Sequence, residues 1–231
     1  DGTVVEELFY YHPSFTEPQL FERINPFGSA FPSEFAILDG VLYFYAETGA
    51  YGPELYRLRG ISEDVEVAAY RANPANLVPL LLTPYDGKLY FRADSNLDIP
   101  SPGAEIELWV YDPQGSGPAN TRASLVGSIT GSGDAISELY VYDGKLYLTA
   151  RDTGGGIGWE LYVYDGTAIS NIDVNGDVSY SSNPGRFLEY DGALYMSATG
   201  LEVGREIWKL ENGAASLVAD GWPGTGGSLP G

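Results

Sequence analysis

The chain has 231 residues, 44% of them hydrophobic, which suffices for a sizeable buried core and excludes a disordered chain. Its formal charge of −20 at pH 7 excludes nucleic acid and anionic membrane surfaces as partners, because like charges repel. The chain has no cysteine, which excludes disulfides and thiolate sites, and it has no apolar run near the ~20 residues needed for membrane insertion.

Glycine, proline and tyrosine are abundant, with 30, 15 and 18 copies, which favours turns and strands over helices. Four apolar segments align without a gap, and each follows an Asp-Gly pair: residues 41–46, 88–93, 145–150 and 193–198. Between apolar runs, Asp-Gly supplies the positive φ angles of a two-residue type I′ hairpin. A turn between a first and a second strand is therefore predicted at Asp39-Gly40, Asp86-Gly87, Asp143-Gly144 and Asp191-Gly192.

A second repeated column predicts a third strand after each hairpin. It consists of Glu54-Leu55-Tyr56, Glu107-Leu108-Trp109, Glu160-Leu161-Tyr162 and Glu206-Ile207-Trp208, with a further copy, Glu7-Leu8-Phe9, near the start. A fourth strand is expected after another turn, as at Asp165-Gly166. Four short strands repeated about every 47 residues are typical of propeller blades, since one blade alone cannot bury both of its faces.

In chain order, the columns place the outer half of a blade at residues 1–24. Four complete blades follow at about 25–71, 72–128, 129–174 and 175–220, and a further blade begins at 221–231. The predicted fold class is therefore an all-β, β-propeller-like single domain of four-stranded antiparallel blades, in a five-bladed or larger array. An incomplete blade would leave unpaired backbone groups, so we expect a fragment of a longer repeat protein. Closure of the two ends into a partial fifth blade is the alternative.

The second strand of the first complete blade carries apolar or aromatic residues on both of its faces. Leu42 and Phe44 point one way, while Tyr43 and Tyr45 point the other. A sheet that is covered on both faces has this pattern, whereas a sandwich with one wetted face alternates apolar with polar residues. The pattern favours a propeller over a sandwich and leaves a β-solenoid open.

The repeat resembles that of the ELWxxDGT family of large bacterial surface or secreted proteins, and the resemblance covers nearly the whole chain. It depends on the Asp-Gly-x-Leu-Tyr segments, the Glu-Leu-Trp/Tyr column and Pro/Gly/Ser-rich segments such as residues 182–185 and 223–230. The chain departs from the pattern: only Trp109 and Trp208 keep the tryptophan, only Asp165-Gly166-Thr167 is a complete Asp-Gly-Thr, and residues 96–103 are inserted. The resemblance implies a propeller-like fold and an extracellular or cell-surface location in bacteria.

Long glycine-rich loops of varied sequence follow the second strands at residues 47–53, 94–104, 152–159 and 199–205. In a propeller these loops open on one face, which we expect to bind a protein or a glycan. Aromatic rings on such loops can stack on sugars, and the candidates are Tyr51, Trp159 and Trp222. Asp152 joins them, because residues 152–159 faintly resemble a sialidase Asp box, although the spacing from Asp to Trp is too long.

Oxygen-bearing side chains occupy every second position of one segment, at Asp173, Asn175, Asp177 and Ser179. This pattern resembles the start of a calcium loop, so calcium is the one cofactor that the sequence suggests. The segment lacks the glycine at the sixth position, and Pro184 stands where a bidentate glutamate should close the loop. Turn chemistry through local side-chain hydrogen bonds explains the same residues.

No catalytic residue can be assigned from the sequence. The repeated glutamates occupy equivalent positions, which predicts a structural role, and the lone His12 precedes a proline in a predicted turn. The sequence therefore favours a non-enzymatic extracellular binding or structural module. Two alternatives stay open: a glycan-active propeller enzyme, which would need converging carboxylates, and a self-associating scaffold whose incomplete blade is completed by strands of another copy.

Overall fold

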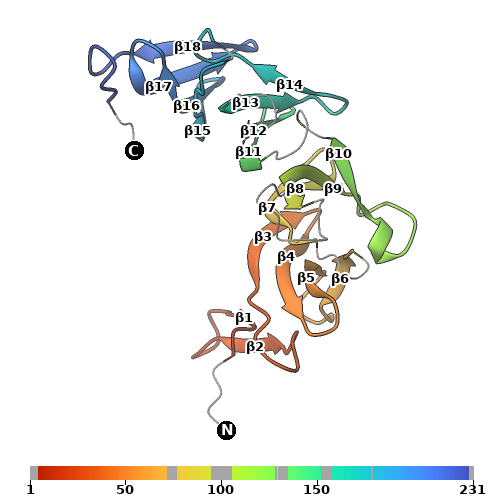
Figure 1. Ribbon diagram of the computed structural model, residues 1–231. Helices are drawn as coiled ribbons and strands as arrows, with labels where there is room; N and C mark the ends of the chain where they lie inside the picture. Colours follow the sequence, from red (N-terminus) through yellow and green to blue (C-terminus); the bar gives the residue numbers. More distant parts are fainter. Residues whose placement is uncertain are drawn as a thin grey trace. The chain divides into compact units, whose positions relative to one another are not determined.

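The computed structural model describes residues 5–71, 77–94, 106–127, 129, 135–151, 158–177 and 179–228. The chain divides into two compact units. Unit 1 comprises Asp1–Pro100 and Leu108–Val126, and unit 2 comprises Ser101–Glu107 and Gly127–Gly231. Figure 1 labels the strands of both units.

Unit 1 begins with a two-stranded antiparallel sheet, here called the half-blade, and continues with two four-stranded sheets, blade 1 and blade 2. The half-blade contains β1 (Leu8–Tyr10) and β2 (Gln19–Glu22). Blade 1 contains β3 (Ser33–Leu38), β4 (Val41–Thr48), β5 (Gly52–Leu58) and β6 (Glu66–Ala69). Blade 2 contains β7 (Leu80–Tyr85), β8 (Lys88–Asp94), β9 (Ile106–Tyr111) and β10 (Ala123–Gly127).

Unit 2 contains two further four-stranded sheets, blade 3 and blade 4. Blade 3 contains β11 (Ala135–Tyr142), β12 (Lys145–Arg151), β13 (Trp159–Tyr164) and β14 (Ile169–Ile172). Blade 4 contains β15 (Gly185–Tyr190), β16 (Ala193–Gly200), β17 (Gly204–Glu211) and β18 (Ala214–Ala219). In every blade the strands lie side by side in chain order (Figure 1).

The Asp-Gly turns have the predicted geometry. Asp39 and Gly40 have φ angles of 51° and 76°, and the three other pairs also have two positive φ angles. Positive φ at both central residues defines a type I′ turn, whose twist matches that of the two strands that it joins. In blade 1 the turn pairs Leu38 with Val41 and so sets the register of β3 against β4.

Both faces of blade 1 are buried, as the sequence predicts. Phe44 packs with Leu8 and Ile24 against the half-blade, whereas Tyr43 belongs to the core shared with blade 2. A corresponding core joins blades 3 and 4 in unit 2. Sheets that bury both faces against neighbouring sheets are the construction of a propeller. The all-β propeller class is therefore confirmed: the described residues form four four-stranded antiparallel blades and one two-stranded sheet. The single domain and the five-bladed or larger array stay predictions.

The helix found in the described part of the chain is η1 (Ala119–Thr121), one 3-10 turn in the β9–β10 connection. With three residues it is far too short to cross a bilayer.

Candidate functional site

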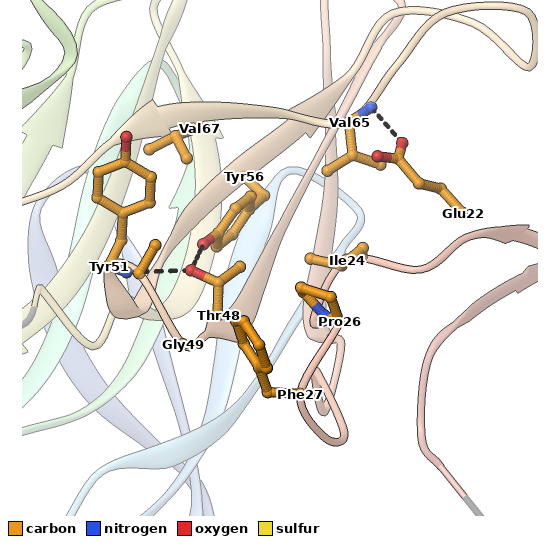
Figure 2. Close-up of a pocket in the computed structure, with 11 residues that line it drawn as sticks. Glu22, Ile24, Pro26, Phe27, Thr48, Gly49, Tyr51, Tyr56, Val65 and Val67 are labelled. Atoms are coloured by element: carbon orange, nitrogen blue, oxygen red, sulfur yellow. Dashed lines mark hydrogen bonds between the residues drawn. The ribbon is translucent and has the colours of Figure 1, made fainter.

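A cavity of about 250 Å³ lies in unit 1, beside the β4–β5 loop (Figure 2). One wall comes from the segment that connects the half-blade to blade 1, and the other walls come from the β4–β5 loop and from β6 with the residue before it. The lining residues are Glu22, Ile24, Pro26, Phe27, Thr48, Gly49, Ala50, Tyr51, Tyr56, Val65 and Val67. We call this hollow the aromatic cavity.

Two rings at the aromatic cavity are open to solvent. Phe27 is 89% exposed and Tyr51 is 47% exposed. The Tyr51 ring rests on Tyr70, with a distance of 5.0 Å between the ring centroids. Figure 2 shows Phe27 and Tyr51 on different sides of Thr48 and Gly49. Exposed rings beside apolar walls give a ligand flat apolar surfaces on which it can stack.

Local hydrogen bonds hold the loop that carries Phe27. The Phe27 N–H donates to Oδ1 of Asn25 over 3.1 Å, and Nδ2 of Asn25 donates to the Ser29 carbonyl over 2.9 Å. This arrangement is an Asx turn, in which an asparagine side chain replaces backbone partners. Gly49 lies under the ring, since a Cβ atom there would be 3.0 Å from Cδ2 of Phe27. The loop geometry and the missing side chain together place the Phe27 ring.

The aromatic cavity also contains a few fixed polar groups. Oγ1 of Thr48 accepts the Tyr51 N–H over 3.1 Å and the Tyr56 hydroxyl over 3.0 Å. Burial raises the pKa of Tyr56 to about 12, so its hydroxyl stays protonated at neutral pH. Oε2 of Glu22 accepts the Val65 N–H over 2.9 Å. Such a cavity can hold a ring-shaped ligand with an apolar face and a polar edge.

Of the predicted ligand-binding residues, only Tyr51 lines this cavity. Trp159 and Trp222 belong to unit 2, and Asp152 lies outside the described residues. Trp159 is half-buried, with the Arg151 guanidinium 5.2 Å from its ring centroid. Trp222 is 66% exposed. The Trp159 ring is therefore already in contact with Arg151, whereas most of the Trp222 side chain is exposed to solvent.

Sequence reasoning missed Phe27. The available signal was an aromatic residue inside the turn-forming run from Asn25 to Ser29, since a bulky apolar side chain in a tight polar turn has nowhere to pack locally. No such signal marks Ile24 and Val65 as lining residues. Ile24 lies between β2 and β3 and Val65 lies between β5 and β6, so the two residues come together only in the folded chain.

The predicted calcium segment forms consecutive side-chain turns. Oδ1 of Asp173 accepts the Gly176 N–H over 2.8 Å, and Oδ1 of Asn175 accepts the Asp177 N–H over 3.0 Å. Oδ1 of Asp177 accepts both the N–H and the hydroxyl of Ser179, which lowers the pKa of Asp177. In the described part of the chain, no three His, Cys, Asp or Glu side chains are grouped as a metal site. Calcium binding stays a prediction, to be tested by melting the protein with calcium and with chelator.

The repeated glutamates join each sheet to the chain segment that follows it. The carboxyl groups of Glu7, Glu54, Glu160 and Glu206 accept backbone N–H groups of Ile24, Leu77, Ser182 and Ser228 respectively. All four carboxyl side chains are buried. These hydrogen bonds give the column a structural role, because each one satisfies a backbone donor in the segment that follows the sheet. His12 bonds only locally, to the hydroxyl and the N–H of Ser14.

No protein-family model and no curated protein sequence matches the chain. Among solved structures, a Trypanosoma rangeli sialidase in complex with the inhibitor DANA is similar with a TM-score of 0.47 and 16% identity, over 84% of this chain and 40% of that chain. An α-L-arabinofuranosidase from Lactobacillus brevis is similar with a TM-score of 0.41 and 15% identity, over 84% and 71%. A second α-L-arabinofuranosidase, from Clostridium thermocellum, is similar with a TM-score of 0.39 and 13% identity, over 87% of this chain and 74% of that chain. The chain spans less than half the length of the sialidase.

These comparisons correct one expectation. The sequence favoured a non-enzymatic module, whereas the similar solved structures reported above are named as sialidases and arabinofuranosidases, which are enzymes that act on glycans. The sequence had left a glycan-active propeller enzyme open as an alternative. At these identities the likeness concerns the fold and assigns no reaction. Membership of the ELWxxDGT family, the extracellular location, and association with proteins or with further copies stay predictions.

Proposed function

We propose that the protein is part of a glycan-active propeller and that the aromatic cavity binds one sugar ring of its carbohydrate ligand. The single observation that carries this proposal is the pairing of two exposed rings, Phe27 and Tyr51, at the walls of one small cavity. The C–H face of a sugar stacks on aromatic rings, while its hydroxyl groups need nearby donors and acceptors. Thr48 and Glu22 supply such groups at the same cavity.

The role proposed for this cavity is recognition of the glycan and not cleavage of its bond. Glycoside hydrolysis uses two carboxyl groups that flank the scissile bond. Glu22 is the one acid among the described residues that line the cavity, and its Oε2 already accepts the Val65 N–H. The cavity therefore supports a binding subsite, with the reacting groups of the glycan-active protein elsewhere.

Titration with xylotriose, arabinotriose and sialyllactose tests this proposal, with calorimetry as the readout. Loss of one stacked ring removes about 1–2 kcal/mol, so Phe27→Ala and Tyr51→Ala should each weaken binding of the preferred sugar about 5- to 30-fold. Tyr11→Ala is the matched control, because Tyr11 is 63% exposed in the same unit and does not line the cavity. If none of the three sugars binds, or if the two variants bind as tightly as the control, the proposal is wrong.

A further inference from the structure

A second and larger cavity, of about 450 Å³, lies in unit 2 at the opposite ends of the strands, where the Asp-Gly hairpins of blades 3 and 4 meet. It is lined by Tyr142, Asp143, Lys145, Tyr147, Glu189, Gly192, Asn212 and Gly213. We call it the hairpin cavity. The predicted binding face was the long-loop face, so a cavity beside the Asp-Gly hairpins was not expected.

The lining of the hairpin cavity includes unused hydrogen-bonding groups. Tyr147 is only 4% exposed, its ring packs against Tyr142 at 5.9 Å, and it lines the cavity. Tyr142 donates its own hydroxyl to the Gly192 carbonyl over 2.6 Å. The Tyr147 hydroxyl, by contrast, has no hydrogen-bond partner within the part of the chain that the structure describes. A tyrosine hydroxyl that lines a polar cavity and has no protein partner can donate to and accept from a ligand or a water molecule.

Three charged groups stand at the rim of the same cavity. The side chains of Asp143, Lys145 and Glu189 form no ion pair or hydrogen bond with any residue in the described ranges. Together with Tyr147 they offer two carboxylate acceptors, one ammonium donor and one hydroxyl. A ligand that both donates and accepts many hydrogen bonds would use all four groups, and a sugar is such a ligand.

The corresponding cavity in unit 1 differs in its hydrogen bonds and ion pairs. A cavity of about 200 Å³ lies between the hairpin of blade 1 and the β9–β10 turn, and it includes Tyr43 at the repeat position of Tyr147. There Arg57 lines the cavity and is already paired: it donates to the Tyr111 hydroxyl over 3.3 Å and forms an ion pair with Glu66 at 2.7 Å. The repeat therefore creates a cavity in both units, but Arg57 of the unit 1 cavity is already paired with Glu66, whereas Lys145 in the hairpin cavity has no such pair among the described residues.

We propose that the hairpin cavity is a second binding site, for a neutral polyhydroxylated ligand such as one neutral sugar, with Tyr147, Asp143, Glu189 and Lys145 as its hydrogen-bonding groups. Two carboxylates against one ammonium group make the site net negative, and the whole chain carries a charge of −20. Burial raises the pKa of Tyr142, and the nearby carboxylates of Asp143, Glu189 and Glu211 raise it further. The same negative potential disfavours acidic sugars. The site shares the ligand class of the proposed function but uses residues of the other unit, so either proposal can fail alone.

The test uses the full chain and NMR titration with D-galactose, D-xylose, L-arabinose and D-glucuronate. Tyr147→Phe keeps the buried ring and removes only the hydroxyl, so binding of the preferred neutral sugar should weaken about fivefold. Glu189→Gln should weaken that binding similarly and improve the relative binding of glucuronate. Tyr43→Phe is the control, because it removes the hydroxyl of an equally buried tyrosine at the same repeat position in unit 1, away from the hairpin cavity.

The outcomes separate the two proposals. Binding that Tyr147→Phe weakens and Tyr43→Phe leaves unchanged supports the hairpin cavity. Binding that Tyr147→Phe does not change, but Phe27→Ala abolishes, overturns the hairpin site and supports the aromatic cavity. Absence of binding by every neutral sugar overturns the hairpin site, and so does glucuronate binding as tight as that of the best neutral sugar.

Discussion

The Glu160 carboxylate holds Ser182 by two hydrogen bonds, one from the Ser182 N–H over 2.9 Å and one from its hydroxyl over 2.5 Å. Both residues are buried, and 22 positions separate them in the chain. Glu206 binds the N–H and the hydroxyl of Ser228 in the same way, again across 22 positions. The glutamate of a third strand thus fixes the segment that leads away from its own sheet.

This pair should contribute measurably to stability. A hydrogen bond to a charged group contributes about 1.5–3 kcal/mol, so Ser182→Ala should lower the free energy of unfolding by roughly that amount. Glu160→Gln should cost a similar amount, and the double variant should cost less than the sum, because both changes remove the same interaction. Urea unfolding of the four proteins measures the coupling, with the exposed Ser170→Ala as control. Strictly additive effects would show that the pair does not act as a unit.

Glu54 predicts a specific dependence of stability on pH. Burial raises the pKa of Glu54 to about 8 from an ordinary 4.5, against the opposing effect of hydrogen bonds from Leu77 and Arg71. The folded state then holds the proton more tightly than the unfolded state does. The stabilisation is complete below pH 4.5 and is lost as pH rises toward 8, by at most about 1.4 kcal/mol per pH unit.

Glu54→Gln removes this titration. The variant should therefore gain stability relative to the wild type as pH rises from 5 to 8, as measured by urea unfolding at each pH. Glu63→Gln at an exposed loop position controls for the general effect of removing one negative charge. A difference between Glu54→Gln and wild type that stays constant with pH would mean that Glu54 titrates at the same pH in both states.

Backbone strain at the start of the blades gives a reciprocal pair of predictions. The residue before the first proline of a blade has a positive φ angle, 44° at Val78 and 48° at Asn183. A β-branched side chain is strained there by roughly 1–2 kcal/mol, whereas asparagine tolerates the conformation. Val78→Asn should therefore raise the free energy of unfolding by about 1 kcal/mol, and Asn183→Val should lower it by about the same amount. Thermal unfolding checks both signs, and equal effects of the same sign would contradict the strain argument.

The fold could be predicted from the sequence because its determinants are local. Asp39-Gly40 fixes a turn by itself, and the alternation of Tyr43 with Phe44 already indicates a sheet that is covered on both faces. Neither inference needs to know which chain segment lies opposite. The position of each strand along the chain follows from these turns and from the spacing of the repeat.

The binding sites could not be predicted in the same way. A cavity is the space that side chains leave after packing, so it depends on segments that meet only in the folded chain. Tyr51 could be named as an exposed loop aromatic, but nothing in the sequence places Phe27 next to the β4–β5 loop. Trp159 was predicted to offer its ring to a sugar, but the Arg151 guanidinium lies over that ring in the folded chain. The sequence does not indicate Tyr147 as a binding residue, since its repeat position predicts packing in the core. Its hydroxyl lacks a partner among the described residues because of which side chains surround it in the fold.

Gly49 offers a test of the aromatic cavity that leaves both rings in place. A Cβ atom at Gly49 would lie 3.0 Å from Cδ2 of Phe27, and the larger side chain of valine would occupy the space that the ring uses now. Gly49→Val should therefore displace the ring and weaken binding of the preferred trisaccharide about fivefold or more, because stacking depends on ring position. The melting temperature should change little, since Phe27 is 89% exposed and buries little surface.

The control is Gly60→Val, because a Cβ atom at Gly60 has no heavy atom within 4 Å and the residue lies in the same unit. Calorimetric titration of both variants, with circular dichroism to verify folding, separates ring displacement from a general cost of valine in a loop. Affinity retained in Gly49→Val but lost in Tyr51→Ala would restrict the sugar subsite to the Tyr51 side of the cavity. Affinity lost equally in both valine variants would attribute the effect to loop conformation and not to the Phe27 ring.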